Sequence, residues 1–126
     1  MSLKSPLGKV LGLGSAKDGT DHWWSQRVSA VAMIPLTLWF AFSMLTMPDF
    51  GYFTVRSWMA APLNAVLLLL LVGSLLYHSK LGTQVVVEDY VHGFKKVATL
   101  IILKFIYAAL AVAAVFSILR VSLGAV

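Results

Sequence analysis

The sequence contains no cysteine, and this absence excludes several kinds of chemistry. Without thiols the chain forms no disulfide, builds no thiolate metal site and ligates no iron–sulfur cluster. Charged residues are also scarce, at 12% of the 126 residues, whereas 60% are hydrophobic. This balance is too apolar for a water-soluble protein of this length, and it indicates an integral membrane protein.

The long apolar stretches hold no Asp or Glu away from their ends. Cation transporters generally need an acid at membrane depth, so this absence disfavours a proton-coupled antiporter. We expect no signal peptide, because the first apolar run is long enough to span, follows a polar segment and lacks a small-x-small cleavage site. The first arginine is Arg27, so no arginine-rich transit peptide is expected and the chain is interpreted as mature from its start.

Three apolar stretches are long enough to cross the hydrocarbon core of a bilayer, which takes ~20 helical residues. They cover residues 28–47, 63–87 and 97–122, and polar or turn-rich connectors separate them. The sequence therefore predicts an all-α membrane protein with three transmembrane helices and a polar amino-terminal tail. Residues 1–126 form a single membrane-anchor domain in this interpretation, and Pro35 should kink the first helix.

Positive charge is distributed unequally between the two ends of these spans. The amino-terminal tail and the second connector carry Lys4, Lys9, Lys17, Arg27, Lys95 and Lys96, whereas the opposite side carries Arg56 and Arg120. The positive-inside rule therefore predicts that the amino terminus faces the cytoplasm. The net charge of +5 is explained as an insertion signal in contact with the bilayer, and nothing indicates a nucleic-acid partner.

Aromatic residues cluster near the expected membrane surfaces. Those near the cytoplasmic surface are Trp23, Trp24 and Tyr90, and those near the opposite surface are Tyr52, Phe53 and Trp58. Such aromatic belts anchor membrane proteins at the lipid–water interface.

His78 lies inside the second apolar stretch, where an ionisable group is costly and usually marks a cofactor, ion or proton site. Helical spacing places Ser74 and Gly82 one turn on either side of it, on the same face. Spacing alone leaves two interpretations open. Either this face is a packing seam with His78 hydrogen-bonded across it, or the small neighbours form a slot for a porphyrin with His78 as an axial iron ligand.

A haem with two histidine ligands needs histidines on facing helices, and this chain offers one at membrane depth. The other two, His22 and His92, fall in polar segments. A second ligand would then come from a partner membrane subunit, with the haem at the seam between the chains.

Asp89 and Tyr90 follow His78 where the apolar stretch ends. A continuous helix would place Asp89 within ~20° of the His78 face and ~16 Å along the axis, near the membrane surface. A phenol can donate a hydrogen bond to a carbonyl oxygen, and a carboxylate can orient it or relay a proton, as quinone reduction requires. The alternative is an ordinary helix end with an interfacial tyrosine.

The pattern His78-x3-Gly82-x6-Asp89-Tyr90-Val91, on the second of three spans, resembles the small hydrophobic membrane anchor of succinate dehydrogenase. The segment Gln26-Arg-Val-Ser-Ala30 at the start of the first helix supports the resemblance. It implies that His78 ligates haem b together with a histidine of the sister membrane anchor. It also implies that Tyr90 hydrogen-bonds ubiquinone near the iron–sulfur subunit, with Asp89 supporting that site.

The resemblance further implies a subunit without catalytic residues in succinate:quinone oxidoreductase, respiratory complex II. There a flavoprotein oxidises succinate as part of the tricarboxylic acid cycle, iron–sulfur clusters carry the electrons, and ubiquinone is reduced in the membrane. The expected location is a bacterial inner membrane rather than a mitochondrial one.

Three other cations need an interpretation, and two of them, Arg27 and Lys80, have two. Arg27 either anchors the helix at the membrane surface or contacts a haem propionate or the quinone site. Lys80 either extends to the surface or meets a haem propionate, and Lys104 is expected to extend to the surface. The alternative functions are a haem-free membrane anchor and a small membrane subunit or transporter with no redox role.

Overall fold

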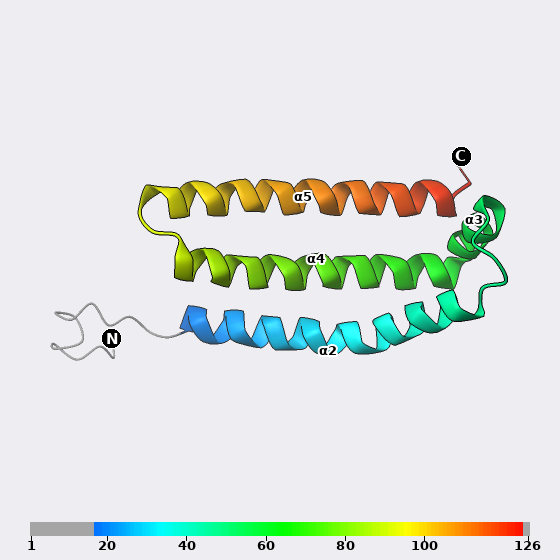
Figure 1. The fold of residues 1–126 in the computed structure, drawn as a ribbon, viewed down its shortest axis with the longest axis horizontal. Helices are drawn as coiled ribbons and strands as arrows, with labels where there is room; N and C mark the ends of the chain where they lie inside the picture. Colours follow the sequence, from blue (N-terminus) through cyan, green and yellow to red (C-terminus); the bar gives the residue numbers. More distant parts are fainter. Residues whose placement is uncertain (1–16, 125–126) are drawn as a thin grey trace, which may run out of the picture.

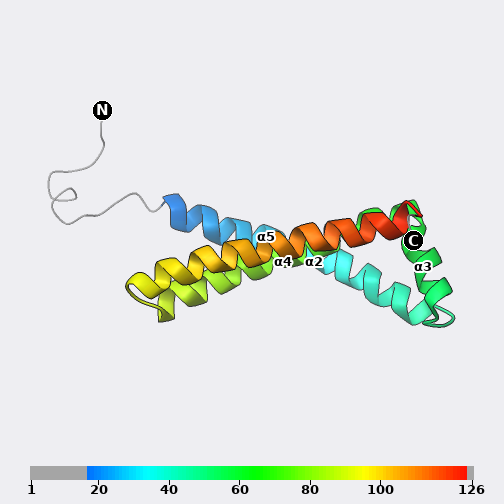
Figure 2. The ribbon, with the colours of Figure 1, turned by 90° about the horizontal axis from the view of Figure 1, so that it is seen from above.

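A computed structural model describes residues 17–124, and within them the chain is helical with short connections. The helices are α2 (Lys17–Thr46), α3 (Tyr52–Ala60), α4 (Pro62–Tyr90) and α5 (Phe94–Ser122). The three long helices lie alongside one another, and the short α3 lies across one end of them (Figures 1 and 2). The predicted all-α class is confirmed.

The long helices form a layer with α4 in the middle (Figure 1). Helix α4 packs against α2 on one side and against α5 on the other, whereas the backbones of α2 and α5 do not approach each other over the described residues. Figure 2 shows α2 crossing the α4–α5 pair at an angle. Because the layer is open, many large apolar side chains of the described residues are exposed.

Three of the described helices are long and apolar enough to cross a membrane, over Thr20–Thr46, Pro62–Tyr90 and Phe94–Ser122. The predicted number of spans is confirmed, but the helices are longer than the apolar runs. Helix α2 begins at Lys17, so residues 17–27, predicted as part of a polar tail, are helical. The reason is that a helix satisfies its own backbone hydrogen bonds and can continue beyond the hydrocarbon. Residues 1–16 lie outside the described residues.

Helix α3 occupies most of the first connector and was not predicted from the sequence. The connection to α4 is a sharp corner at Ala61, whose extended backbone (φ −61°, ψ 126°) fits the residue before a proline. The amide of Asn64 in α4 donates a hydrogen bond to the carbonyl oxygen of Trp58, at 2.8 Å. That bond satisfies a carbonyl near the end of α3 and holds the short helix across the ends of α4 and α5.

The best-packed region is at the α3 end of the layer. Ala65, Leu68 and Ile118 are buried there, and partly buried side chains of α2 and α3 surround them. The ring of Trp39 in α2 stacks on that of Trp58 in α3, with ring centroids 5.6 Å apart. All four helices therefore meet at this end. Pro35 lies inside α2, which bends along its length in Figure 1.

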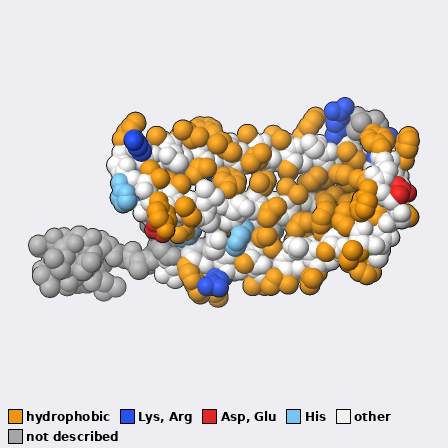
Figure 3. All heavy atoms as spheres, in the orientation of Figure 1, with side chains coloured by type: hydrophobic (Ala, Val, Ile, Leu, Met, Phe, Trp, Pro, Cys, Tyr) orange, Lys and Arg blue, Asp and Glu red, His pale blue; other side chains and the backbone are white. Residues whose placement is uncertain are grey.

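Most of the large apolar side chains lie at the surface. Figure 3 shows hydrophobic side chains over most of one face, with charged side chains mainly toward the two ends. Such an apolar surface suits lipid or a second membrane protein, since the described residues leave it exposed and water solvates it poorly.

Replacing Leu68 by alanine should destabilise the protein, because Leu68 is only 8% exposed and a cavity would form where the helices meet. We expect a loss of about 2 kcal/mol or more. The measurement is the temperature at which the detergent-solubilised protein loses its monodisperse size-exclusion peak. Leu70→Ala is the matched control, because Leu70 lies in the same helix and is 53% exposed. Equal effects of the two substitutions would contradict this packing.

Candidate functional site

His78 lies in α4, half-buried, with its imidazole directed at α2. Its Nδ1 lies 3.1 Å from Ser29 Oγ, and its Nε2 lies 3.4 Å from Gln26 Nε2. Both partners come from α2, so the histidine bridges the two helices. The structure thus shows the hydrogen bonding across the seam that the packing interpretation expected of His78, whereas Ser74 lines an open groove rather than a packed contact. The role of His78 as a haem ligand stays a prediction.

The hydrogen bonds of Ser29 favour one tautomer of the neutral His78 ring. Ser29 is buried, and its hydroxyl lies 3.0 Å from the carbonyl oxygen of Gln26, which can only accept. The hydroxyl hydrogen therefore points at that carbonyl, and Ser29 Oγ accepts a hydrogen bond from His78 Nδ1–H. The neutral ring then carries its lone pair on Nε2, where the Gln26 amide donates a long hydrogen bond. A histidine ligates a metal through such a lone pair.

The polar residues of α2 that face this seam repeat at helical spacing. His22, Gln26 and Ser29 are separated by four and three residues, which places them on one side of the helix. Gln26 Oε1 and His22 Nε2 are both buried and have no hydrogen-bond partner among the described residues. The seam therefore has unused hydrogen-bonding capacity, which is unusual for buried polar atoms. This stripe was not predicted from the sequence, although helical periodicity reveals it.

The two sides of His78 differ in how much space they leave. On the Gly82 side, a Cβ added to the glycine would lie 3.5 Å from Gln26 Nε2, so the Gln26 side chain fills that part of the expected slot. On the Ser74 side, a groove of about 720 Å³ opens between α2 and α4. Its lining includes Ser74 and Ser29, and it is otherwise mostly apolar.

Arg27 lies next to Gln26 but points to another side of α2, because consecutive helical residues differ by ~100°. Its side chain is exposed, and the guanidinium carbon lies 5.3 Å from the centroid of the Trp23 ring. Trp23 in turn stacks on Trp24, at 5.5 Å. Arg27 therefore belongs to an exposed aromatic–cation cluster. The structure records no contact between Arg27 and His78.

Asp89 and Tyr90 are the last residues of α4, which is helical up to Tyr90. Asp89 therefore lies on the His78 side of α4, about 16 Å along the axis. Asp89 is exposed and Tyr90 is 81% exposed, and neither side chain bonds to another described residue. An acid–phenol hydrogen bond is thus not formed within this part of the chain, and both groups are accessible to a partner or a ligand.

The end of α4 is nevertheless held in place. Lys96, in the first turn of α5, donates a hydrogen bond from Nζ to the carbonyl oxygen of Glu88, at 3.0 Å. The Gln84 amide donates to Glu88 Oε1 at 2.8 Å. The turn between the helices needs Gly93, because its φ of +66° is strained for other residues. The sequence thus positions Asp89 and Tyr90 at a well-defined helix end.

The described residues contain no group of three or more His, Cys, Asp or Glu side chains that could hold a metal ion. A haem iron takes its equatorial ligands from the porphyrin and needs only axial ligands from protein. The relevant question for haem is therefore whether Nε2 of His78 is accessible.

Comparison with known proteins identifies the family. A profile of the succinate dehydrogenase/fumarate reductase transmembrane subunits matches residues 1–119. The succinate dehydrogenase hydrophobic membrane anchor subunit of Rickettsia conorii is 37% identical over 79% of this chain and 80% of its own length. The protein of the same name from Paracoccus denitrificans is 32% identical over 97% of this chain and 95% of its own length. The chain belongs to the succinate dehydrogenase/fumarate reductase transmembrane subunit family.

Membership of this family confirms the resemblance drawn from the His78-to-Val91 pattern. The hydrophobic membrane anchor of Rickettsia bellii is a further relative, 33% identical over 88% of this chain and 89% of its own length. No solved structure matches the chain. The candidate site residues of this chain are therefore His78 in the α2–α4 seam and Asp89 and Tyr90 at the α4 end.

A leucine at position 82 should force α2 away from α4, because its side chain would have to displace Gln26. We expect Gly82→Leu to cost about 1–3 kcal/mol of stability, as overpacked sites do. Gly82→Ala is the matched control, since its Cβ would make ordinary van der Waals contact at 3.5 Å. Thermal stability in detergent distinguishes them, and a Gly82→Leu protein as stable as Gly82→Ala would contradict the seam.

Proposed function

We propose that this chain is the hydrophobic membrane anchor of a succinate dehydrogenase complex, respiratory complex II, in a bacterial inner membrane. Three observations support the proposal: membership of the family, three helices able to cross a membrane, and relatives of nearly the same length that bear this name. Its partners would be a flavoprotein, an iron–sulfur protein and the sister membrane anchor. We further propose that the amino terminus and the α4–α5 turn face the cytoplasm.

We propose that His78 supplies one axial ligand to haem b. The observation that carries this proposal is the bond from His78 Nδ1–H to Ser29, which leaves the Nε2 lone pair for a metal. A hydrogen bond to the non-ligating nitrogen is the usual way in which a protein orients a ligating histidine.

The residues around His78 are compatible with haem. Nε2 is bonded only through a contact of 3.4 Å to Gln26, whose other amide atom has no partner among the described residues. Moving the Gln26 side chain would therefore break one long hydrogen bond. The groove on the Ser74 side, about 720 Å³, is within the size range of cofactor pockets; Ser29, which bonds to His78, lines it, but His78 itself does not.

When bound, haem b supplies a one-electron carrier between the partner subunits and the quinone. The chain itself contributes orientation. The hydrogen bond to Ser29 orients the imidazole ring of His78 and favours one tautomer. The packing of α2 on α4 fixes the position of that ring along the helix. The second axial ligand would come from the sister anchor. His22 is seven residues from Ser29, about 10 Å along α2, and His92 lies in the turn after α4, so neither lies beside His78.

We propose that Tyr90 donates a hydrogen bond to a carbonyl oxygen of ubiquinone. Its phenol is exposed at the end of α4, so it is available to a site completed by partner subunits. Asp89, also exposed, would accept or relay a proton as the quinone is reduced. Arg27 would contribute a cation to the haem propionates or to the quinone pocket, provided that it leaves its contact with Trp23.

A haem-free anchor is the second candidate. It is favoured by one observation, that both nitrogens of His78 already have neighbours in α2. In that case the histidine stabilises the α2–α4 contact, and Asp89 and Tyr90 keep their roles.

Replacing His78 by leucine should remove the b-type haem signal, because the axial nitrogen is lost and leucine offers no ligand in its place. The measurement is a dithionite-reduced minus oxidised absorption spectrum of the complex purified with this chain in mild detergent. His92→Leu, at the exposed turn after α4, is the matched control and should keep the full signal. An unchanged haem signal in His78→Leu would rule out His78 as the ligand, whereas no haem signal in the complex with the unsubstituted chain would favour the haem-free anchor.

Replacing Tyr90 by phenylalanine should lower succinate:ubiquinone reductase activity about tenfold, because one hydrogen bond to the quinone is lost. Succinate oxidation with a soluble dye acceptor, which bypasses the membrane site, should stay unchanged. Tyr52→Phe serves as the control, since Tyr52 is an exposed tyrosine of α3 at the other end of the layer. Equal quinone reductase activities in Tyr90→Phe and Tyr52→Phe would rule out this role for Tyr90.

A further inference from the structure

The groove between α4 and α5 lies on the opposite side of α4 from His78. We propose that it binds one anionic phospholipid, with the phosphate on Lys80 and Lys104 and an acyl chain along the apolar floor. This proposal goes beyond the haem and quinone roles and holds whether or not either is correct.

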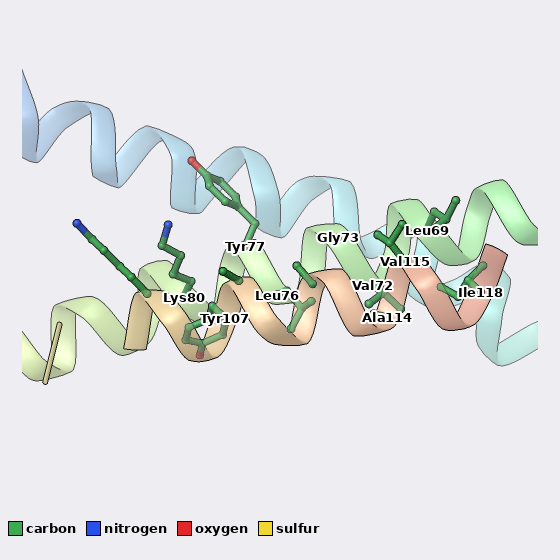
Figure 4. Close-up of a pocket in the computed structure, with 13 residues that line it drawn as sticks. Leu69, Val72, Gly73, Leu76, Tyr77, Lys80, Tyr107, Ala114, Val115 and Ile118 are labelled. Atoms are coloured by element: carbon green, nitrogen blue, oxygen red, sulfur yellow. The ribbon is translucent and has the colours of Figure 1, made fainter. Parts of the chain in front are cut away.

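The groove has a volume of about 280 Å³, and both helices line it (Figure 4). Lys80 lies toward one end, and Leu69 and Ile118 lie toward the other (Figure 4). Lys80 and Lys104 also line a smaller recess together, so the two lysines are neighbours across the helix pair. The groove is thus charged at one end and apolar along the rest.

The two lysines have no counter-ion among the described residues. Neither forms an ion pair there, and the nearest acid on α4, Glu88, is eight residues from Lys80, or about 12 Å along the helix. Paired cations near hydrocarbon are costly unless an anion neutralises them. A lipid phosphate supplies that anion, and basic pockets between transmembrane helices recognise such headgroups.

The depth of the lysines suits a headgroup. Helices α4 and α5 have 29 residues each, about 43 Å, and so exceed the ~30 Å hydrocarbon core. If the core begins at Pro62 and Ser122, it ends about 20 residues along each helix. Lys80 and Lys104 lie within about two residues of that level, where lipid phosphates approach the hydrocarbon.

The floor of the groove suits an acyl chain. Small residues keep it open: Gly73, Ala108, Ala111 and Ala114. From Lys80 to Leu69 it follows eleven residues of α4, about 16 Å, which is close to the thickness of one hydrocarbon leaflet, about 15 Å. One extended acyl chain therefore matches the groove in length and polarity.

The wall beside the lysines is fixed by hydrogen bonds. The Thr83 hydroxyl donates to the carbonyl oxygen of Ser79 at 2.8 Å, so the Tyr107 hydroxyl donates to Thr83 Oγ1 at 2.9 Å. This bond joins α5 to α4 within one turn of Lys80. The cation pair is thus presented by a joined pair of helices rather than by two independent ones.

The alternative anion is a haem propionate, as considered for Lys80 from the sequence. Lys80 is two residues from His78, about 200° around the helix. His78 bonds to α2, whereas Lys80 lines the groove against α5. A haem ligated by His78 would therefore lie on the other side of α4, and this geometry favours lipid.

The test is native mass spectrometry of the intact complex, delipidated in mild detergent and titrated with phosphatidylglycerol or phosphatidylcholine. We expect one phosphatidylglycerol to bind per copy of this chain, much more tightly than phosphatidylcholine. Lys80→Gln and Lys104→Gln should each weaken this binding roughly fivefold, and the double variant about thirtyfold. Lys95→Gln is the matched control, because it removes one exposed lysine in the first turn of α5 and should have no effect.

A second variant tests the groove without changing charge. Ala111→Phe should fill the floor and prevent phosphatidylglycerol binding while both lysines remain. Unchanged binding in Ala111→Phe or in the double lysine variant would overturn the proposal, as would equal binding of the two lipids. If the double lysine variant lost the haem signal but still bound phosphatidylglycerol, the lysines would be assigned to haem, and the lipid proposal would be overturned. These outcomes differ from failure of the proposed function, which His78→Leu and Tyr90→Phe test.

Discussion

The structure depends on one constraint: α4 is the helix that packs against both other long helices. The two sides of α4 therefore pack against different helices. His78 on one side bonds to Ser29 and Gln26 of α2, whereas Lys80 on another side lines the groove against α5. The end of the same helix presents Asp89 and Tyr90. A single continuous helix thus sets the spacing and direction of each candidate site, because a regular helix leaves little freedom in either.

The open layer explains why this chain needs a partner or lipid on its faces. In a closed bundle the first and last helices would pack together along their length, but here the backbones of α2 and α5 stay apart over the described residues. Packing is concentrated at the α3 end, around Leu68 and Ile118. The seam around His78 is polar and incompletely hydrogen-bonded instead. Stability and candidate function therefore occupy different parts of the same layer, as expected if the functional part is completed by other subunits.

Much of the fold and part of the candidate site could be predicted from the sequence. Apolar runs of sufficient length revealed the three spans, and the continuous helix from His78 to Asp89 that the spacing argument assumed is present in α4. Prediction failed where hydropathy carries little information. Helix α3 is too short to span and was missed, and so were the helical residues 17–27, which are polar. Hydropathy reports where a helix meets lipid, whereas helix ends depend on local backbone hydrogen bonds and on residues such as Pro62.

The sequence by itself determined the class of protein, the number of spans and the family pattern from His78 to Val91. These follow from composition and from spacing along one helix, which need no knowledge of neighbours. Only the tertiary structure decided what His78 contacts, which of its nitrogens keeps the lone pair, and that Lys80 and Lys104 share a groove. Each of these depends on residues of two helices far apart in the chain. Their proximity is set by how α2 and α5 pack on α4, and helical periodicity within one segment does not specify that packing.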